Sequence, residues 1–155
     1  IISRVAQKAG DYEELFASCA QGTLYALQEE FNVKDSMALK AATVFPGIAL
    51  TGETCGAVVG SLMTLGILFG REKPGDVEAF IKTLQAARKF LSAFEKEFGS
   101  SKCKDIHPKL LGRTYNFADP KDAEEFAKAG GLKICRTPPE KAARIVAKII
   151  LDSKR

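Results

Sequence analysis

Histidine is almost absent from this sequence, and its scarcity excludes several kinds of site. His107 is the only histidine, whereas a Rieske-type iron–sulfur centre needs two in one chain. No Ser-His-Asp set stands out, and a catalytic Cys-His pair is weakly supported. His107 precedes Pro108, and the residue before a proline is pushed out of the helical conformation. We therefore expect a helix to end before His107 and its imidazole to lie at the surface.

Closely spaced cysteines are absent too. The four cysteines are Cys19, Cys55, Cys103 and Cys135, whereas zinc knuckles, thioredoxin-like motifs and ferredoxins contain cysteines a few residues apart. The haem-attachment motif Cys-x-x-Cys-His is also missing, so a haem is not expected. What remains is four thiols that only the tertiary structure can bring together. Such a convergent site suits an iron–sulfur cluster or a redox dithiol, and suits a structural zinc ion less well.

Long apolar runs and basic clusters are lacking as well. The apolar stretch from Val58 to Phe69 is shorter than the ~20 residues that span a bilayer, so no membrane span is expected. Lys and Arg number 23 against 19 Asp and Glu, a mild excess without the basic arm that would predict nucleic-acid binding. The 155 residues fit one domain, 1–155, without internal repeats. No signal peptide is readable at Ile1, which leaves a cytoplasmic location and export after signal removal both open.

The stretch from Thr51 to Gly70 is the part of the chain around which the rest is expected to fold. From Gly56 on it predicts a helix with no continuous polar face, which is stable only when buried on all sides. Gly56 and Gly60 weaken such a helix by about 1 kcal/mol each relative to Ala, and they share one face because they are four residues apart. We expect another backbone or a cofactor to approach that face closely. Cys55 at the helix N-terminus would meet free N–H groups that favour a thiolate.

Helical patterns account for the rest of the chain, and no strand pair with a hairpin turn is present. One long helix is expected from a capping box at Asp11 and Glu14 to Phe31, with Cys19 in its middle facing the core. The other expected helices cover 37–44, 56–69, 76–98, 119–129 and 137 onward. A further short helix, capped by Ser100 or Ser101, is expected to carry Cys103 in its first turn and to stop before His107. In the helix over 76–98, the apolar positions from Val77 onward are expected to face inward. The sequence therefore predicts an all-α, single-domain bundle of about six or seven helices.

A longer pattern of residues resembles a known family. The run Thr51-Gly52-Glu53-Thr54-Cys55-Gly56-Ala57-Val58-Val59-Gly60, followed by Leu62-Met63, Leu65-Gly66 and Phe69-Gly70, resembles the signature of the redox-active C-GCAxxG-C-C family. The other cysteines fit in order and setting: Cys19 in an N-terminal helix, Cys103 after Phe98-Gly99-Ser100-Ser101-Lys102, and Cys135 ahead of the final helix. The resemblance extends over nearly the whole chain. One departure is Phe45-Pro46-Gly47-Ile48-Ala49-Leu50, where the family leads us to expect a run richer in glycine.

The resemblance implies a small redox protein associated with an oxidoreductase or a transport system. The chain also resembles the non-haem domain of split-Soret cytochrome c, in which a two-iron cluster has been described. These likenesses imply that Cys19, Cys55, Cys103 and Cys135 are the ligands of a 2Fe-2S cluster.

We therefore expect an electron-transfer module or redox subunit rather than a stand-alone enzyme. Its partner would be a redox protein, such as an oxidoreductase subunit, and a homo-oligomer stays open. Gly56 and Gly60 are the residues expected to give the cofactor close backbone approach. The alternatives are a thiol–disulfide oxidoreductase that uses the same cysteines and a structural zinc site with four cysteine ligands.

Overall fold

The computed structural model describes residues 1–155 as an all-helical fold without strands, which confirms the expected fold class. The helices are α1 (Ile2–Phe16), α2 (Cys19–Glu30), α3 (Ser36–Ala41), α4 (Gly47–Leu50), α5 (Gly56–Phe69), α6 (Val77–Phe98), α7 (Cys103–Leu111), α8 (Pro120–Lys128), α9 (Gly131–Ile134) and α10 (Thr137–Ser153), with a 3₁₀ turn η1 (Ala42–Val44). Eight of them have six residues or more, and α4 and α9 have four. No helix combines the length and the apolar character that a membrane crossing needs.

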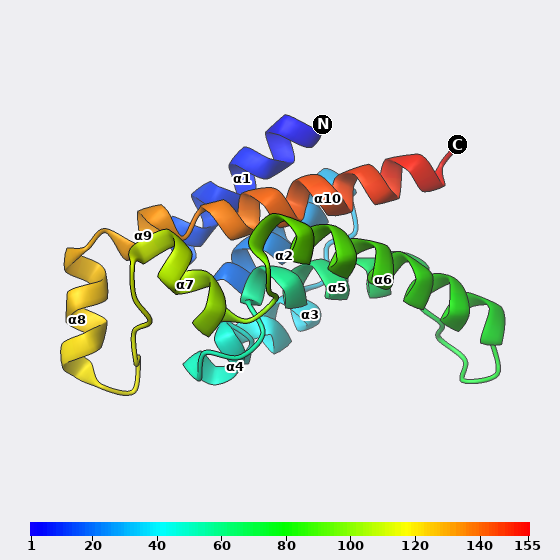
Figure 1. Ribbon diagram of the computed structural model, residues 1–155. Coiled ribbons are helices and arrows are strands. Elements are labelled where there is room, and N and C mark those ends of the chain that lie inside the picture. Colours follow the sequence, from blue (N-terminus) through cyan, green and yellow to red (C-terminus); the bar gives the residue numbers. More distant parts are fainter.

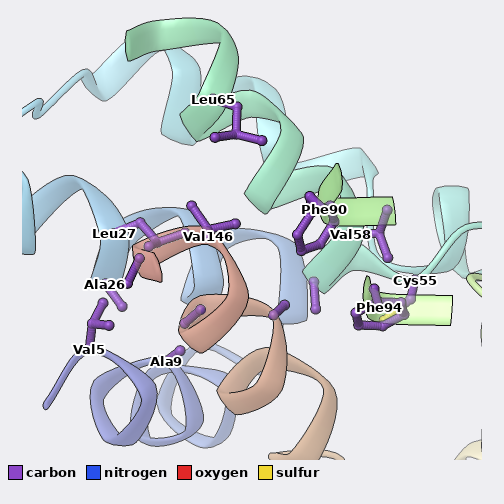
Figure 2. Close-up of a cluster of buried hydrophobic side chains, with 14 of the residues drawn as sticks. Val5, Ala9, Ala26, Leu27, Cys55, Val58, Leu65, Phe90, Phe94 and Val146 are labelled. Atoms are coloured by element: carbon purple, nitrogen blue, oxygen red, sulfur yellow. The ribbon is translucent and has the colours of Figure 1, made fainter. Parts of the chain in front are cut away.

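Five helices, α1, α2, α5, α6 and α10, form the central bundle (Figure 1). Helix α1 packs against α2 and α10, while α5 packs against α2, α6 and α10. The side of α5 that faces these helices is buried, with Val58 and Leu65 fully covered. Its other side is partly open, and Ile67 is 36% exposed, so the burial on all sides that the sequence predicted is realised only in part. Figure 2 shows the apolar core of this bundle, with Cys55 at its edge beside Phe94. The core therefore extends directly to one of the four cysteines.

The contact between α2 and α5 depends on the glycines of α5. A Cβ atom on Gly60 would lie 2.6 Å from the carbonyl oxygen of Ala20, and one on Gly56 would lie 2.7 Å from the Ala20 nitrogen. Real Cβ atoms do not approach backbone atoms so closely, so only glycine permits this separation of the two helices. The close backbone approach expected from the sequence is thus made by α2, and the packing offsets the poor helix propensity of glycine.

The long helix predicted from Asp11 to Phe31 is wrong, because the chain breaks between α1 and α2. Ala17 adopts the left-handed conformation with φ 51°. Ser18 then caps α2, and its hydroxyl accepts a hydrogen bond from the Gln21 N–H at 3.2 Å. Asp11 lies inside α1 rather than at its start. The apolar spacing continues across the break because α1 and α2 both pack into the same bundle, so spacing alone did not reveal it.

Helix α6 has the predicted ends but not the predicted burial. The Asp76 carboxylate accepts a hydrogen bond from the Ala79 N–H at 3.1 Å, and Gly99 ends the helix with φ 74°. Its C-terminal half buries Phe90, Phe94 and Phe98. Its N-terminal half extends beyond the bundle (Figure 1), so the first apolar residues are exposed: Val77 by 57%, Phe80 by 40% and Ile81 by 50%.

Helix α7 continues through Pro108, contrary to the expected end before His107. Proline has no N–H to donate to the carbonyl group four residues earlier, which belongs to Lys104. The hydroxyl of Thr114 donates to that carbonyl at 3.0 Å instead. The helix then ends at Gly112, which has φ 79°. A replacement donor from the following loop therefore allows the proline to remain inside the helix.

Candidate functional site

A short pairing of two distant segments brings Cys55 and Cys103 to the same place. The N–H of Cys55 donates to the Ser101 carbonyl at 2.8 Å, and the N–H of Cys103 donates to the Glu53 carbonyl at 2.8 Å. Cys55 is the N-cap of α5, and Cys103 is the first residue of α7. The pairing thus aligns the N-termini of two helices, each with a cysteine at its start.

Cys19 is the first residue of α2, so its predicted position in the middle of a helix is wrong. The close packing of α2 on α5 places its thiol against Gly56, whose N–H donates a hydrogen bond to the sulfur. A Cβ atom on Gly56 would collide with that sulfur. The thiol of Cys55 is close enough to raise the pKa of Cys19. Gly56, in the first turn of α5, thus supplies a backbone N–H to the sulfur of Cys19.

Cys135 lies at the end of α9 and is fixed by the residue that follows it. The guanidinium of Arg136 donates to Asp11 at 2.8 Å and to Glu14 at 2.7 Å, both on α1, and to Glu140 on α10 at 3.1 Å. This network ties the α9–α10 junction to the C-terminal part of α1. Cys135 therefore stands ahead of the final helix, as predicted, at a position determined by α1.

His107 is buried, so its predicted place at the surface is wrong. It lies one turn after Cys103 on α7 and is only 5% exposed. Its Nε2 atom is 3.2 Å from the sulfur of Cys103 and 3.6 Å from the sulfur of Cys135. The ring stacks on Phe126 and meets the edge of Phe117. The single histidine thus joins the thiols of two segments that are far apart in the sequence.

All four cysteines line one cavity of about 240 Å³. Its wall is mostly apolar and consists of Glu13, Ala17, Cys19, Pro46, Leu50, Cys55, Cys103, Ile106, His107, Phe117, Ala123, Phe126, Ala127, Leu132, Cys135, Pro138 and Pro139. Apart from the thiols, Glu13 and His107 are its only polar side chains, and neither lysine nor arginine lines it. Negative charge in this cavity would therefore meet backbone N–H groups and two polar side chains rather than a cation.

The rim of the cavity contains the segment in which the sequence departs from the expected glycine-rich run. Pro46 and Leu50 line the cavity, and the residues between them form a left-handed turn, with φ 48° at Ile48, 55° at Ala49 and 59° at Leu50. Left-handed backbone costs about 1–2 kcal/mol for each residue other than glycine. The turn thus has the conformation that glycine favours, although three of its residues carry side chains.

All four thiols are free, and three of them have raised pKa values. None of the four cysteines forms a disulfide. The neighbouring thiol of Cys55 and burial raise the pKa of Cys19 well above its ordinary value. Burial raises the pKa of Cys103 to about 12 and also raises the pKa of Cys135. Three thiols are therefore held in the protonated form at neutral pH, which makes them weak nucleophiles.

Glu13 is a site residue that the sequence analysis did not identify. Its side chain lies on α1, is 4% exposed and lines the cavity. Burial is the main cause that raises its pKa to about 8. A signal was present, because Ala6, Ala9 and Glu13 follow each other at three- and four-residue intervals and so share one helix face. The capping box assigned to Asp11 and Glu14 obscured that pattern.

The four sulfur atoms line the cavity in two groups. Cys19 and Cys55 form one, and Cys103 and Cys135 form the other around His107. No three His, Cys, Asp or Glu side chains in the chain are arranged to hold a single metal ion. The arrangement is thus a shared cavity with sulfur in two places rather than a preformed one-ion site.

Comparison with known proteins gives one match. The chain matches the family model described as "Putative redox-active protein (C_GCAxxG_C_C)" over residues 17–149, a range that contains all four cysteines. No curated protein and no solved structure matches it. Because this range covers most of the chain, the protein belongs to the redox-active C_GCAxxG_C_C family.

Proposed function

We propose that this protein transfers electrons through a 2Fe-2S cluster held by Cys19, Cys55, Cys103 and Cys135. The observation that carries the proposal is that four cysteines, dispersed over the whole chain, line one mostly apolar cavity. When bound, such a cluster takes up and releases one electron at a time. The electron would be exchanged with a redox partner protein, for which the protein serves as a module or subunit.

The donor set fits this cofactor. A two-iron cluster takes four thiolates, two on each iron, and the cavity has sulfur in two groups of two. A single zinc ion needs four ligands around one point, which the side chains do not provide. Metal binding deprotonates a coordinating thiol, so the raised pKa values of the free thiols do not prevent it.

The protein's own groups would stabilise the anionic sulfur. The N–H of Gly56 already donates to the sulfur of Cys19, and Cys55 and Cys103 stand at helix N-termini, where the dipole favours negative charge. Phe117, Phe126 and the other apolar wall residues limit the access of water. Hydrogen bonds to sulfur and exclusion of solvent are the means by which a protein adjusts the potential of such a centre.

A second candidate is thiol–disulfide exchange, in which Cys19 and Cys55 would cycle between dithiol and disulfide. The proximity of the two thiols, each of which lines the cavity, favours this pairing. The raised pKa of Cys19 opposes it, because thiolate is the attacking species. The cluster is therefore the leading proposal and the dithiol the alternative.

The test is anaerobic purification and reconstitution of the full chain, followed by iron, zinc and sulfide analysis and by visible and electron-paramagnetic-resonance spectra. We expect iron and sulfide in equal amounts and a spectrum that each of Cys19→Ser, Cys55→Ser, Cys103→Ser and Cys135→Ser weakens or alters. The Glu95→Gln variant changes an exposed carboxylate on α6 and should keep the wild-type spectrum.

Each alternative gives a different result. Zinc without iron would support a structural zinc site. Colourless protein with variants that fall into two pairs, each pair losing one redox titration, would support the dithiols. A full cluster in Cys19→Ser with an unchanged spectrum would refute the four-cysteine assignment, and His107 would then be examined as a ligand.

A further inference from the structure

Glu13 is the only carboxyl among the buried side chains that have an unpartnered polar atom. Its carboxyl is buried on α1, and Oε2 has no hydrogen-bond partner. Leaving a buried polar atom unpaired costs about 1–3 kcal/mol, and more for a charged group. Such groups are rare in native proteins and often have a role at a functional site. Glu13 lies in the wall of the cavity that contains the four thiols.

No cation is available to pair with Glu13. Neither lysine nor arginine lines the cavity, and Arg136, which follows Cys135, is bound to Asp11, Glu14 and Glu140. The polar side chains that share the cavity with it are the four thiols and His107, whose pKa is lowered by burial. Burial and the neighbouring charge of Glu14 both raise the pKa of Glu13. These surroundings favour the neutral carboxylic acid.

A neutral carboxyl carries an O–H donor. The free thiols of the cavity are not strong acceptors for it. Thiols accept hydrogen bonds weakly, whereas anionic sulfur accepts them well. Four thiolates and the sulfides of a cluster would bring negative charge into a space without cations. The unpaired carboxyl therefore complements an anionic occupant of the cavity.

We propose that Glu13 remains protonated and donates its carboxyl hydrogen bond to the sulfur of the iron–sulfur centre. This inference rests on the proposed function, because the acceptor belongs to the cluster or to its cysteine ligands. A donor directed at sulfur stabilises the reduced, more negative state more than the oxidised one, so it raises the reduction potential. Glu13 thereby helps to set the potential of a site that has few other donors.

The experiment compares two variants of Glu13 in the reconstituted full-length protein. Glu13→Gln keeps the shape and supplies an amide N–H donor, whereas Glu13→Leu keeps the volume and supplies none. We expect the reduction potential of Glu13→Gln to stay close to that of the wild type and that of Glu13→Leu to fall. Gln28→Leu removes another buried polar group, one that does not line the cavity, and should leave the potential unchanged.

Infrared difference spectroscopy gives a second measurement. The wild type should show a protonated-carboxyl C=O band that shifts between the oxidised and reduced protein and is missing in Glu13→Gln. This band would remain observable if Glu13→Leu failed to fold. A purely structural role for Glu13 would not produce a band that responds to the redox state.

Three results would overturn the inference. A rise of the potential in both Glu13 variants would show that the wild-type group is an ionised carboxylate. Unchanged potentials in both variants, with the cluster present, would show that Glu13 makes no contact of consequence with it. Absence of a cluster from the wild type and from all variants would overturn the proposed function together with this inference. The first two results would overturn this inference alone, because the cluster would still be present.

Discussion

The burial of Glu13 makes a quantitative prediction about stability in the reduced, metal-free protein. Its pKa is about 8 in the folded state against 4.5 as the ordinary value. Below pH 4.5 both states are protonated, so the burial of this group carries no charge penalty. As the pH rises from 4.5 to 8, the unfolded chain loses the proton while the folded protein keeps it. The free energy of unfolding therefore falls by about 1.4 kcal/mol per pH unit in this window and then levels off.

The Glu13→Gln variant removes this titration while keeping the size of the side chain. Between about pH 5 and about pH 8, we expect the free energy of unfolding of the variant to rise by about 3 to 4 kcal/mol relative to the wild type. Urea melts followed by circular dichroism at several pH values, with a reducing agent, would measure this difference.

Other groups titrate equally in both proteins and cancel in the comparison. The Glu95→Gln variant, changed at an exposed position on α6, should show no such trend. A wild-type-minus-Glu13→Gln difference that stays constant with pH would refute the buried neutral carboxyl, and with it the electrostatic description of the cavity.

Three further predictions concern the packing that positions the site. Gly60→Ala should destabilise the protein by about 1–3 kcal/mol because its Cβ would meet the α2 backbone, whereas Gly66→Ala, with open space around it, should stabilise by about 0.5–1 kcal/mol. Equal effects of the two substitutions in urea melts would contradict the close packing of α2 and α5. Ala49→Gly should stabilise by about 0.5–1 kcal/mol, because the relief of about 1–2 kcal/mol of left-handed strain exceeds the conformational entropy that glycine loses, while Ala41→Gly in α3 should destabilise by about 0.5–1 kcal/mol. A loss of stability in Ala49→Gly would exclude the left-handed turn. Arg136→Met should destabilise the protein by about 1–3 kcal/mol and lower cluster occupancy, because three carboxylates lose their shared cation near Cys135. Unchanged occupancy after reconstitution would show that the ion pairs of Arg136 do not position Cys135.

Local signals in the sequence were enough to predict the helical class and several element ends. The caps at Asp76 and Gly99 were correct because they act within one turn of the backbone. The apolar composition of α5 correctly predicted a buried face but not the open side that carries Ile67. The sequence missed the break at Ala17 because the apolar spacing of α1 continues into α2, and it ended α7 too early because the donor on Thr114 comes from outside the helix.

The sequence by itself determined which chemistry the site can have, since four cysteines, one histidine and the motif around Cys55 limit it to sulfur-based redox or metal binding. Only the tertiary structure decided that these cysteines share a cavity and that Glu13 and His107 join them. The cysteines are brought together by two features: the backbone pairing of residues 52–55 with 101–104, and the close contact of α2 with the glycines of α5. Burial in an apolar cavity then sets their protonation, because the free energy of a charge depends on the solvent and partners around it, which the order of residues does not specify.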